Sequence, residues 1–271
     1  RVTGVVSDST AVITIVQDGV TIVVVIASVA QAVDVHSATA NEMPDRGFLL
    51  GGIASAESLP VQIADRATGN GLSGVVFSAG VNISTGLSQG CSLIGRKHVI
   101  TRGQRNIIET IDDRPALDVF KESIGDVLSR DLQRVGGYIF AALPISGSDT
   151  GDYLVRNLMG VDPDQGLVAV GDYLEGQERL MFCRRDGNTA REDLLRMLER
   201  LRRRVGERPI RGGIYISCLG RGRYPFGDDS QELRCIQSEL GDFPLVGFFA
   251  NGEIYNGRLY GYTGVLTLEL F

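Results

Sequence analysis

A glycine-rich segment with two arginines is the first part of this sequence that could do chemistry. The segment SCLGRGRYPFG follows an apolar strand pattern and precedes a helical pattern. Glycine lets backbone N–H groups approach a bound anion closely, and the planar guanidinium of Arg221 or Arg223 can hold a carboxylate through two hydrogen bonds. The segment therefore indicates an anion-binding loop at Gly220 and Gly222, with Cys218 at its start. A tight turn with exposed arginines is the structural alternative.

A single acidic residue follows the next apolar run and could complement the arginine. The run PLVGFFANGEI places Glu253 just past the end of a strand candidate. One anion-binding and one cation-binding group across a cleft would suit an amino-acid-like zwitterion. We therefore expect Arg221 to hold the ligand's carboxylate and Glu253 its ammonium group, with a wall of Phe248, Phe249 and Tyr262. An Arg221–Glu253 salt bridge is the alternative. On the ligand hypothesis, Arg221→Ala would remove most of the stabilisation that the ligand provides and leave the fold intact.

Cys91 is the candidate nucleophile of the first half of the chain. It lies in SQGCSLIG, seven residues before His98. Cysteine catalysis needs a base and an orienting third group, and the spacing does not show that the two side chains meet. We therefore favour a buried structural thiol and expect no enzyme, with a Cys91-dependent enzyme as the alternative. The cysteines form no CxxC pair and the histidines no HExxH pattern, so we expect no metal site.

Two charged residues occupy strand positions whose neighbours are mostly apolar. Arg156 lies in LVRN and Asp186 ends FCRRD. Charges in such positions need partners. We therefore expect an ion pair between them, buried or half-buried, with contact to a ligand as the alternative.

The strands and helices that must position these residues are predicted to occur in groups along the sequence and not in strict alternation. Helices are predicted at 189–205 and 229–240, and also after the acid and proline of DDRP. Strands are predicted in the first half at 11–16, 20–30, 74–81, 99–101 and 106–111, and in the second at 138–143, 153–158, 167–170, 179–184, 212–217, 245–250 and 263–271. Those at 153–158, 167–170 and 179–184 resemble a meander. This grouping predicts an α+β fold with largely antiparallel mixed sheets and packed helices. The polar segment 146–151 predicts a boundary between domains 1–143 and 144–271.

Composition limits the function classes. The 271 residues carry a formal net charge of −6, which argues against a nucleic-acid partner. The apolar run at 20–30 is about half the ~20 residues needed to cross a bilayer, so we expect no membrane insertion. Four cysteines without paired spacing indicate free thiols in a reducing compartment, which predicts a cytoplasmic protein.

Motifs in both halves resemble the FIST family, named for F-box and intracellular signal transduction. Four motifs resemble the later part of a FIST N-terminal domain: GGIAS at 51–55, QGCSLIG at 89–95, VITR at 99–102 and RPAL at 114–117. Five motifs resemble the FIST C-terminal domain: DYLVRN at 152–157, FCRRD at 182–186, SCLGRG at 217–222, FG at 226–227 and PLVGFFANGEI at 244–254. The two predicted domains would then be two FIST subdomains, the first with a truncated start.

The resemblance implies a sensory module that binds a small molecule such as an amino acid and acts with a signalling protein partner. It implies no established reaction. Some relatives are similar to haem-based nitric-oxide sensors, so a haem sensor with His36 or His98 as axial ligand is one alternative. A protein-interaction module without a ligand is another.

Overall fold

Strands predominate in the computed structural model of this protein. The described residues are 20–27, 48–54, 61–64, 66–69, 72–78, 80–145, 152–174, 178–229 and 231–271. They form antiparallel and mixed sheets with packed helices, so the predicted α+β class is confirmed. The strand predicted at 11–16 lies outside the described residues.

The chain forms two compact units, and the second is inserted into the sequence of the first. The first unit comprises Arg1–Gly90 and Gly187–Phe271, and the second comprises Cys91–Asp186. Each has its own sheet and its own hydrophobic core. The boundary predicted between residues 143 and 144 concerns family domains along the sequence and stays a prediction.

The first unit is built on one mixed sheet. Its strands run in the order β5-β1-β2-β15-β14-β17-β6, and β16 pairs with β15. The β1–β2 and β14–β15 pairs are parallel, whereas the other neighbours are antiparallel. The bounds are β1 (Val20–Ala27), β2 (Phe48–Ala54), β5 (Leu72–Ser78), β6 (Asn82–Gln89), β14 (Ile210–Cys218), β15 (Leu245–Tyr255), β16 (Arg258–Tyr260) and β17 (Thr263–Leu270), with a separate hairpin of β3 (Val61–Ala64) and β4 (Arg66–Gly69).

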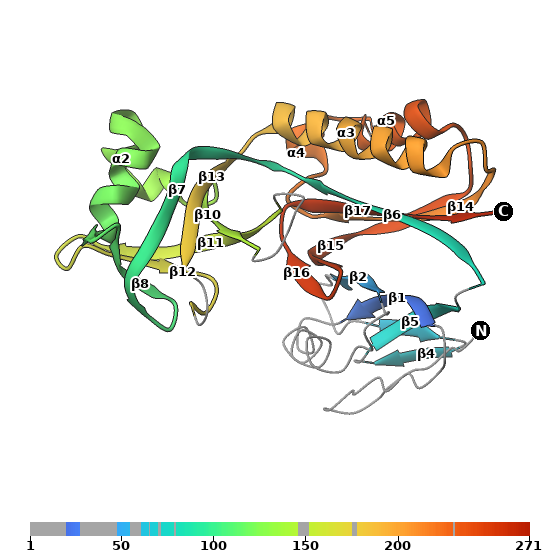
Figure 1. The fold of residues 1–271 in the computed structure, drawn as a ribbon, viewed down its shortest axis with the longest axis horizontal. Coiled ribbons are helices and arrows are strands. Elements are labelled where there is room, and N and C mark those ends of the chain that lie inside the picture. Colours follow the sequence, from blue (N-terminus) through green and yellow to red (C-terminus); the bar gives the residue numbers. More distant parts are fainter. Residues whose placement is uncertain are drawn as a thin grey trace. The chain divides into compact units, whose positions relative to one another are not determined.

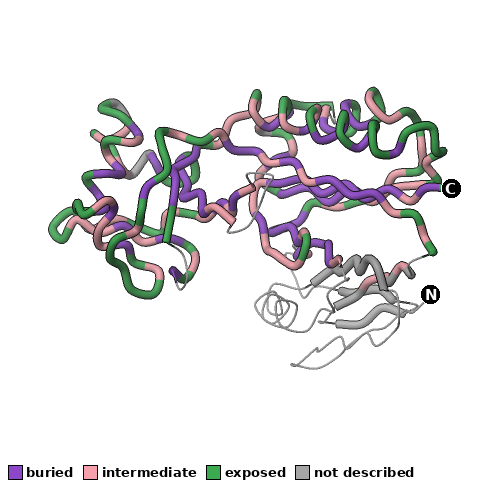
Figure 2. The backbone as a smooth tube through the Cα atoms, in the orientation of Figure 1, coloured by how far each residue is buried: buried purple, intermediate pink, exposed green. Residues whose placement is uncertain are grey.

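Three helices cover one face of the β14–β17–β6 part of this sheet (Figure 1). They are α3 (Gly187–Val205), α4 (Arg223–Phe226) and α5 (Gln231–Leu240). The apolar stripe expected for α3 is confirmed, and its buried residues are Ala190, Leu194, Met197, Leu198, Leu201 and Val205. Gly86 of β6 lets this helix lie close to the sheet, because a Cβ atom there would be 2.5 Å from the Met197 sulfur. The strands under the helices are largely buried, while the outer helix faces are exposed (Figure 2).

Alternating side chains of β14 belong to two apolar layers. Tyr215 packs in the layer under the helices, whereas Ile216 packs with Ala250 and Val265 in a separate cluster. Successive side chains of a strand point to opposite faces of the sheet. The residues at the end of β14 therefore enter two different environments.

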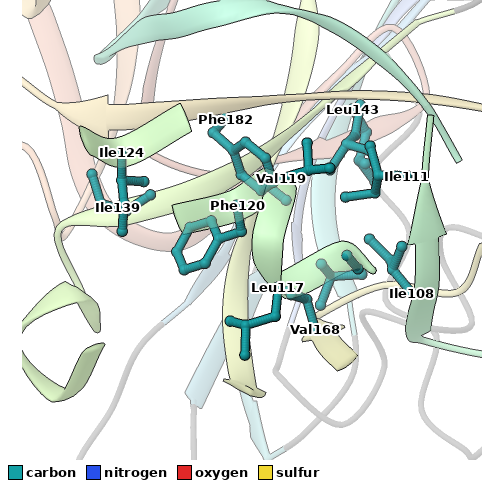
Figure 3. Packing of buried hydrophobic residues seen from close by; sticks show 14 of the residues in the cluster. Ile108, Ile111, Leu117, Val119, Phe120, Ile124, Ile139, Leu143, Val168 and Phe182 are labelled. Carbon is teal, nitrogen blue, oxygen red and sulfur yellow. The ribbon is translucent and has the colours of Figure 1, made fainter. Parts of the chain in front are cut away.

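The second unit is an antiparallel sheet that closes on itself. Its order is β12-β11-β10-β13-β7-β8-β9, and β12 also pairs with β8. The bounds are β7 (Cys91–Gln104), β8 (Ile107–Ile111), β9 (Arg114–Pro115), β10 (Ile139–Pro144), β11 (Tyr153–Asp162), β12 (Leu167–Val170) and β13 (Arg179–Arg185), with α2 (Ala116–Ser129) and the 3-10 helix η2 (Leu132–Val135). Phe120 of α2 packs against Phe182 of β13 with ring centroids 5.0 Å apart (Figure 3).

Two expectations about strand arrangement are wrong. The strands at 153–158, 167–170 and 179–184 do not form a meander, because β13 pairs with β10 and β7 rather than with β12. Strand β15 continues to Tyr255, so Glu253 lies inside the strand and not past its end. A register shift between Ala250 and Glu253 lets the strand continue beside β2.

No helix in the described part of the chain is long and apolar enough to cross a membrane.

Candidate functional site

Arg221, the expected anion-binding residue, is buried, and each of its three side-chain nitrogens donates a hydrogen bond to the protein. Only 1% of the residue is exposed. Its Nε donates to Glu232 Oε1 at 2.8 Å, and its two terminal nitrogens donate to the hydroxyl and carbonyl oxygens of Ser88 at 3.2 and 3.4 Å. The guanidinium also lies over the Phe226 ring, 5.0 Å from its centroid. Arg221 therefore joins the loop after β14 to α5 and β6.

Glu232 is the acidic partner that the sequence analysis missed. Its carboxylate accepts hydrogen bonds from Tyr215 at 2.6 Å and from Ser217 at 3.0 Å, besides the bond from Arg221. Burial raises the pKa of Tyr215 well above its ordinary value, so this hydroxyl keeps its proton and donates it. One sequence signal could have found Glu232: it lies four residues before the buried Ile236 and so belongs to the inward face of α5.

Glu253, the expected ammonium-binding residue, is completely buried. Its Oε2 accepts from the Thr263 hydroxyl at 2.8 Å and from the Thr263 N–H at 3.2 Å, while Oε1 has no hydrogen-bond partner in the described part. Burial raises the pKa of Glu253 to about 7, against the opposing effects of the Thr263 hydrogen bonds and of the Arg221 charge. Burial, together with the Glu253 charge, also raises the pKa of Cys218 to about 12.

Arg221 and Glu253 therefore do not face each other across an open cleft. Each is held by its own partners, Arg221 by Glu232 and Ser88, and Glu253 by Thr263. The alternative Arg221–Glu253 salt bridge is also wrong, since the ion pair of Arg221 is with Glu232.

The glycines of the loop are required by close packing. A Cβ atom on Gly220 would lie 2.7 Å from the Tyr262 ring, and one on Gly222 would lie 3.3 Å from the Phe249 ring. Gly222 also has φ of +25°, a conformation that favours glycine. Closure of this loop around a ligand stays a prediction.

The first unit contains a cavity of about 630 Å³ beside this loop, within the range of small-molecule sites. Of the predicted site residues it is lined by Gly222, Phe248 and Phe249, and not by Arg221, Glu253, Cys218, Gly220 or Tyr262. Its floor includes Tyr215, Ser217 and Glu232. Its other lining residues come mainly from α4, α5 and the start of β15: Arg223, Phe226, Gly227, Asp228, Asp229, Gln231, Leu233, Ile236, Gln237, Gly241, Asp242, Phe243, Leu245, Val246 and Gly247.

Large apolar side chains around this cavity remain exposed. Phe249, Val246 and Leu233 all line it and are 52%, 67% and 45% exposed. Exposed apolar residues gathered around a cavity indicate a binding site more strongly than scattered ones do. The cavity is therefore the candidate functional site of the first unit.

Cys91 and His98 of the second unit do not form a catalytic pair. Both lie on β7, seven residues apart, and strand rise separates them by roughly 20 Å. The Cys91 side chain is a neighbour of Cys183, and hydrogen bonding to Cys91 and burial raise the pKa of Cys183. His98 instead contacts Asp112 at 2.8 Å and Ser123 at 3.4 Å through its two ring nitrogens.

These contacts also bear on the haem alternative. His98 is buried and both of its ring nitrogens face polar partners, so it does not fit an axial ligand. His36 lies outside the described residues. No group of three or more His, Cys, Asp or Glu residues in the described part could hold a metal ion.

Arg156 and Asp186 have ionic partners that the sequence analysis did not predict. Arg156 Nε lies 2.6 Å from Asp172, and Asp186 lies 3.8 Å from Arg184. Arg156 thus joins β11 to the segment after β12, which is a structural role within the second unit.

Comparison with known proteins identifies the family. The FIST N domain model matches residues 3–114 and the FIST C domain model matches residues 116–256. An uncharacterized protein of Mycobacterium tuberculosis is 33% identical over 210 residues, which cover 73% of this chain and 54% of the relative. An uncharacterized protein of Mycobacterium bovis is 32% identical over 193 residues, which cover 67% of this chain and 49% of the relative. The chain spans about half the length of these relatives. Its two family matches together cover most of the sequence, and the chain therefore belongs to the FIST family of signal-transduction sensor domains.

Proposed function

We propose that this chain is an intracellular sensor module that binds a small ligand in the cavity between α5 and β15 and passes the signal to a protein partner. FIST domains are sensor domains of signal transduction. The cavity carries this proposal, because its volume of about 630 Å³ suits a small organic molecule. At its floor, hydrogen bonds to Glu232 hold the hydroxyl groups of Tyr215 and Ser217 in place. The four free, buried cysteines of the chain agree with a reducing, cytoplasmic location.

An amino-acid-like ligand fits the cavity in part. Its ammonium group would meet the acidic residues of the lining, and its side chain would lie against the aromatic walls. The carboxylate would depend on Arg223, the single cationic residue among the lining residues. Arg221, which the sequence analysis assigned to this role, supports the floor through Glu232 instead.

The proposal is tested by isothermal titration calorimetry with a panel of amino acids and related small metabolites. The Val246→Trp variant fills the cavity from an exposed position, and Phe249→Ala removes part of its wall. Tyr173→Ala is the matched control, since it removes a similarly exposed aromatic side chain (67%) in the second unit. We expect saturable binding to the wild type and to Tyr173→Ala, and its loss in Val246→Trp. Binding that persists in Val246→Trp would place the ligand elsewhere.

A further inference from the structure

We propose that the cavity selects a small organic amine, a cation with an apolar body and no carboxylate. This inference rests on the proposed ligand-binding function of the same cavity, and it adds the chemical class of the ligand.

The floor of the cavity accepts hydrogen bonds and has no side-chain donor to spare. The hydroxyl hydrogens of Tyr215 and Ser217 are both committed to Glu232. Glu232 accepts three hydrogen bonds, two at Oε1 and one at Oε2, out of about four that a carboxylate can take. What remains for a ligand is therefore a set of oxygen lone pairs. A ligand N–H satisfies them, whereas a ligand carboxylate would meet only acceptors at this floor.

The charged residues that line the cavity also favour a cation. The Arg223 charge is matched by Asp228, with Nε to Oδ1 at 2.6 Å, and Glu232 is matched by Arg221. Two acids of the lining, Asp229 and Asp242, have no cationic partner in the part of the chain that the structure describes. The lining therefore keeps an excess of negative charge, which attracts a cation and repels an anion.

One feature of the cavity could favour an anion, and the chain itself offsets it. The N-terminal turn of α5 lines the cavity, and helix N-termini attract negative charge. Asp228 and Asp229 lie three and two residues before the first residue of α5, and Glu232 lies within its first turn. These carboxylates already supply the negative charge that the helix end favours.

The walls suit the apolar body of such a cation. Phe226, Phe243, Phe248 and Phe249 all line the cavity. Aromatic faces attract ammonium groups as well as apolar surface, and Phe226 already has the Arg221 guanidinium over its ring. The two unmatched acids flank α5, Asp229 before its first turn and Asp242 after its last. A ligand whose apolar body lies against the phenylalanines can thus place its ammonium group near Asp229 at one end of α5 or near Asp242 at the other.

Three probes that share the same 2-phenylethyl body separate the charge requirements. They are 2-phenylethylamine, phenylalanine and 3-phenylpropanoate, which carry an ammonium group, both charges and a carboxylate, respectively. Titration calorimetry of the whole chain at neutral pH and low salt should give the amine at least tenfold tighter binding than phenylalanine, and no measurable binding of 3-phenylpropanoate. Phenylalanine binding as tightly as the amine would overturn the inference and leave the proposed function standing. The absence of binding for all three, and for the wider panel, would overturn both.

Variants then assign the effect to this cavity. The double variant Asp229→Asn/Asp242→Asn removes both unmatched charges, and we expect it to weaken binding of the amine at least tenfold. Asp164→Asn, an exposed acid of the second unit, is the control and should bind the amine as the wild type does. Unchanged affinity in the double variant would overturn the assignment of the amine to this cavity. The fold of each variant is checked by its thermal unfolding.

Discussion

The Arg221 guanidinium and the Glu232 carboxylate form a buried ion pair, with 1% and 7% of the side chains exposed and an Nε–Oε1 distance of 2.8 Å. The pair connects the loop after β14 with α5, and the remaining nitrogens of Arg221 reach Ser88 of β6. A guanidinium held in this way is unavailable to a ligand. Its function is to fix the carboxylate that forms the cavity floor.

Removing the arginine should therefore destabilise the first unit. We expect Arg221→Ala to lower the free energy of unfolding by about 3–5 kcal/mol, because it leaves the Glu232 carboxylate buried without a counter-charge. This differs from the expectation based on sequence, in which the fold stays intact. The measurement is urea denaturation followed by circular dichroism.

Arg223→Ala is the control for this prediction. Its side chain is 79% exposed and pairs with Asp228, whose side chain is 69% exposed, so its removal should change the stability by less than about 1 kcal/mol. Equal effects of the two substitutions would show that burial of the Arg221–Glu232 pair is not the cause.

Gly247 should tolerate no side chain. A Cβ atom at this position would lie 1.8 Å from the Tyr215 carbonyl oxygen on the neighbouring parallel strand. Gly247→Ala should therefore separate β14 from β15 and cost at least the roughly 1–3 kcal/mol typical of overpacking. Gly80→Ala is the matched control, since a Cβ atom there meets nothing within 4 Å. Thermal unfolding of both variants checks the prediction, and similar melting temperatures would contradict it.

Local patterns in the sequence predicted elements better than their pairing. The stripe of α3 was predictable in full because burial of an amphipathic helix follows its 3.6-residue period. The pairing of β13 with β7, between residues 80 or more positions apart, has no such local signal. The glutamates show the same limit: a buried Glu232 depends on Arg221, and the sequence suggested Glu253 as the partner.

The cavity was predictable only in part for the same reason. Gly222, Phe248 and Phe249 were found because they belong to the loop and strand that carry the family motifs. The acids on either side of α5 became site residues only through the packing of that helix beside β15. No spacing in the sequence shows that packing.

The thiols should be unreactive in the folded protein. All four cysteines are free and buried, and burial raises the pKa of Cys218 to about 12. Labelling with a thiol-specific disulfide reagent at neutral pH should therefore be slow until denaturant is added, because the thiolate is the reactive form. Rapid labelling of Cys91 alone in the native protein, abolished by Cys91→Ser, would instead support the Cys91-dependent enzyme.

Glu253 should make the stability depend on pH. Its pKa rises from an ordinary value of 4.5 to about 7 in the folded protein, with burial as the main cause. The folded state then binds more protons than the unfolded state between these values, so the contribution of Glu253 to stability is full below pH 4.5 and is lost as the pH rises toward 7. The loss amounts to about 3 kcal/mol by the conversion of pKa shifts to free energy.

The Glu253→Gln variant isolates this effect, because an amide cannot ionise and can still accept hydrogen bonds from Thr263. Urea denaturation of both proteins across the acidic to neutral range gives the difference in their free energies of unfolding. We expect the variant to gain stability relative to the wild type as the pH rises from 4.5 to 7, and the difference to level off above that. A difference that does not vary with pH would mean that Glu253 ionises alike in the folded and unfolded chain. Its unpartnered Oε1 would then have to be reached by water or by a donor outside the described residues.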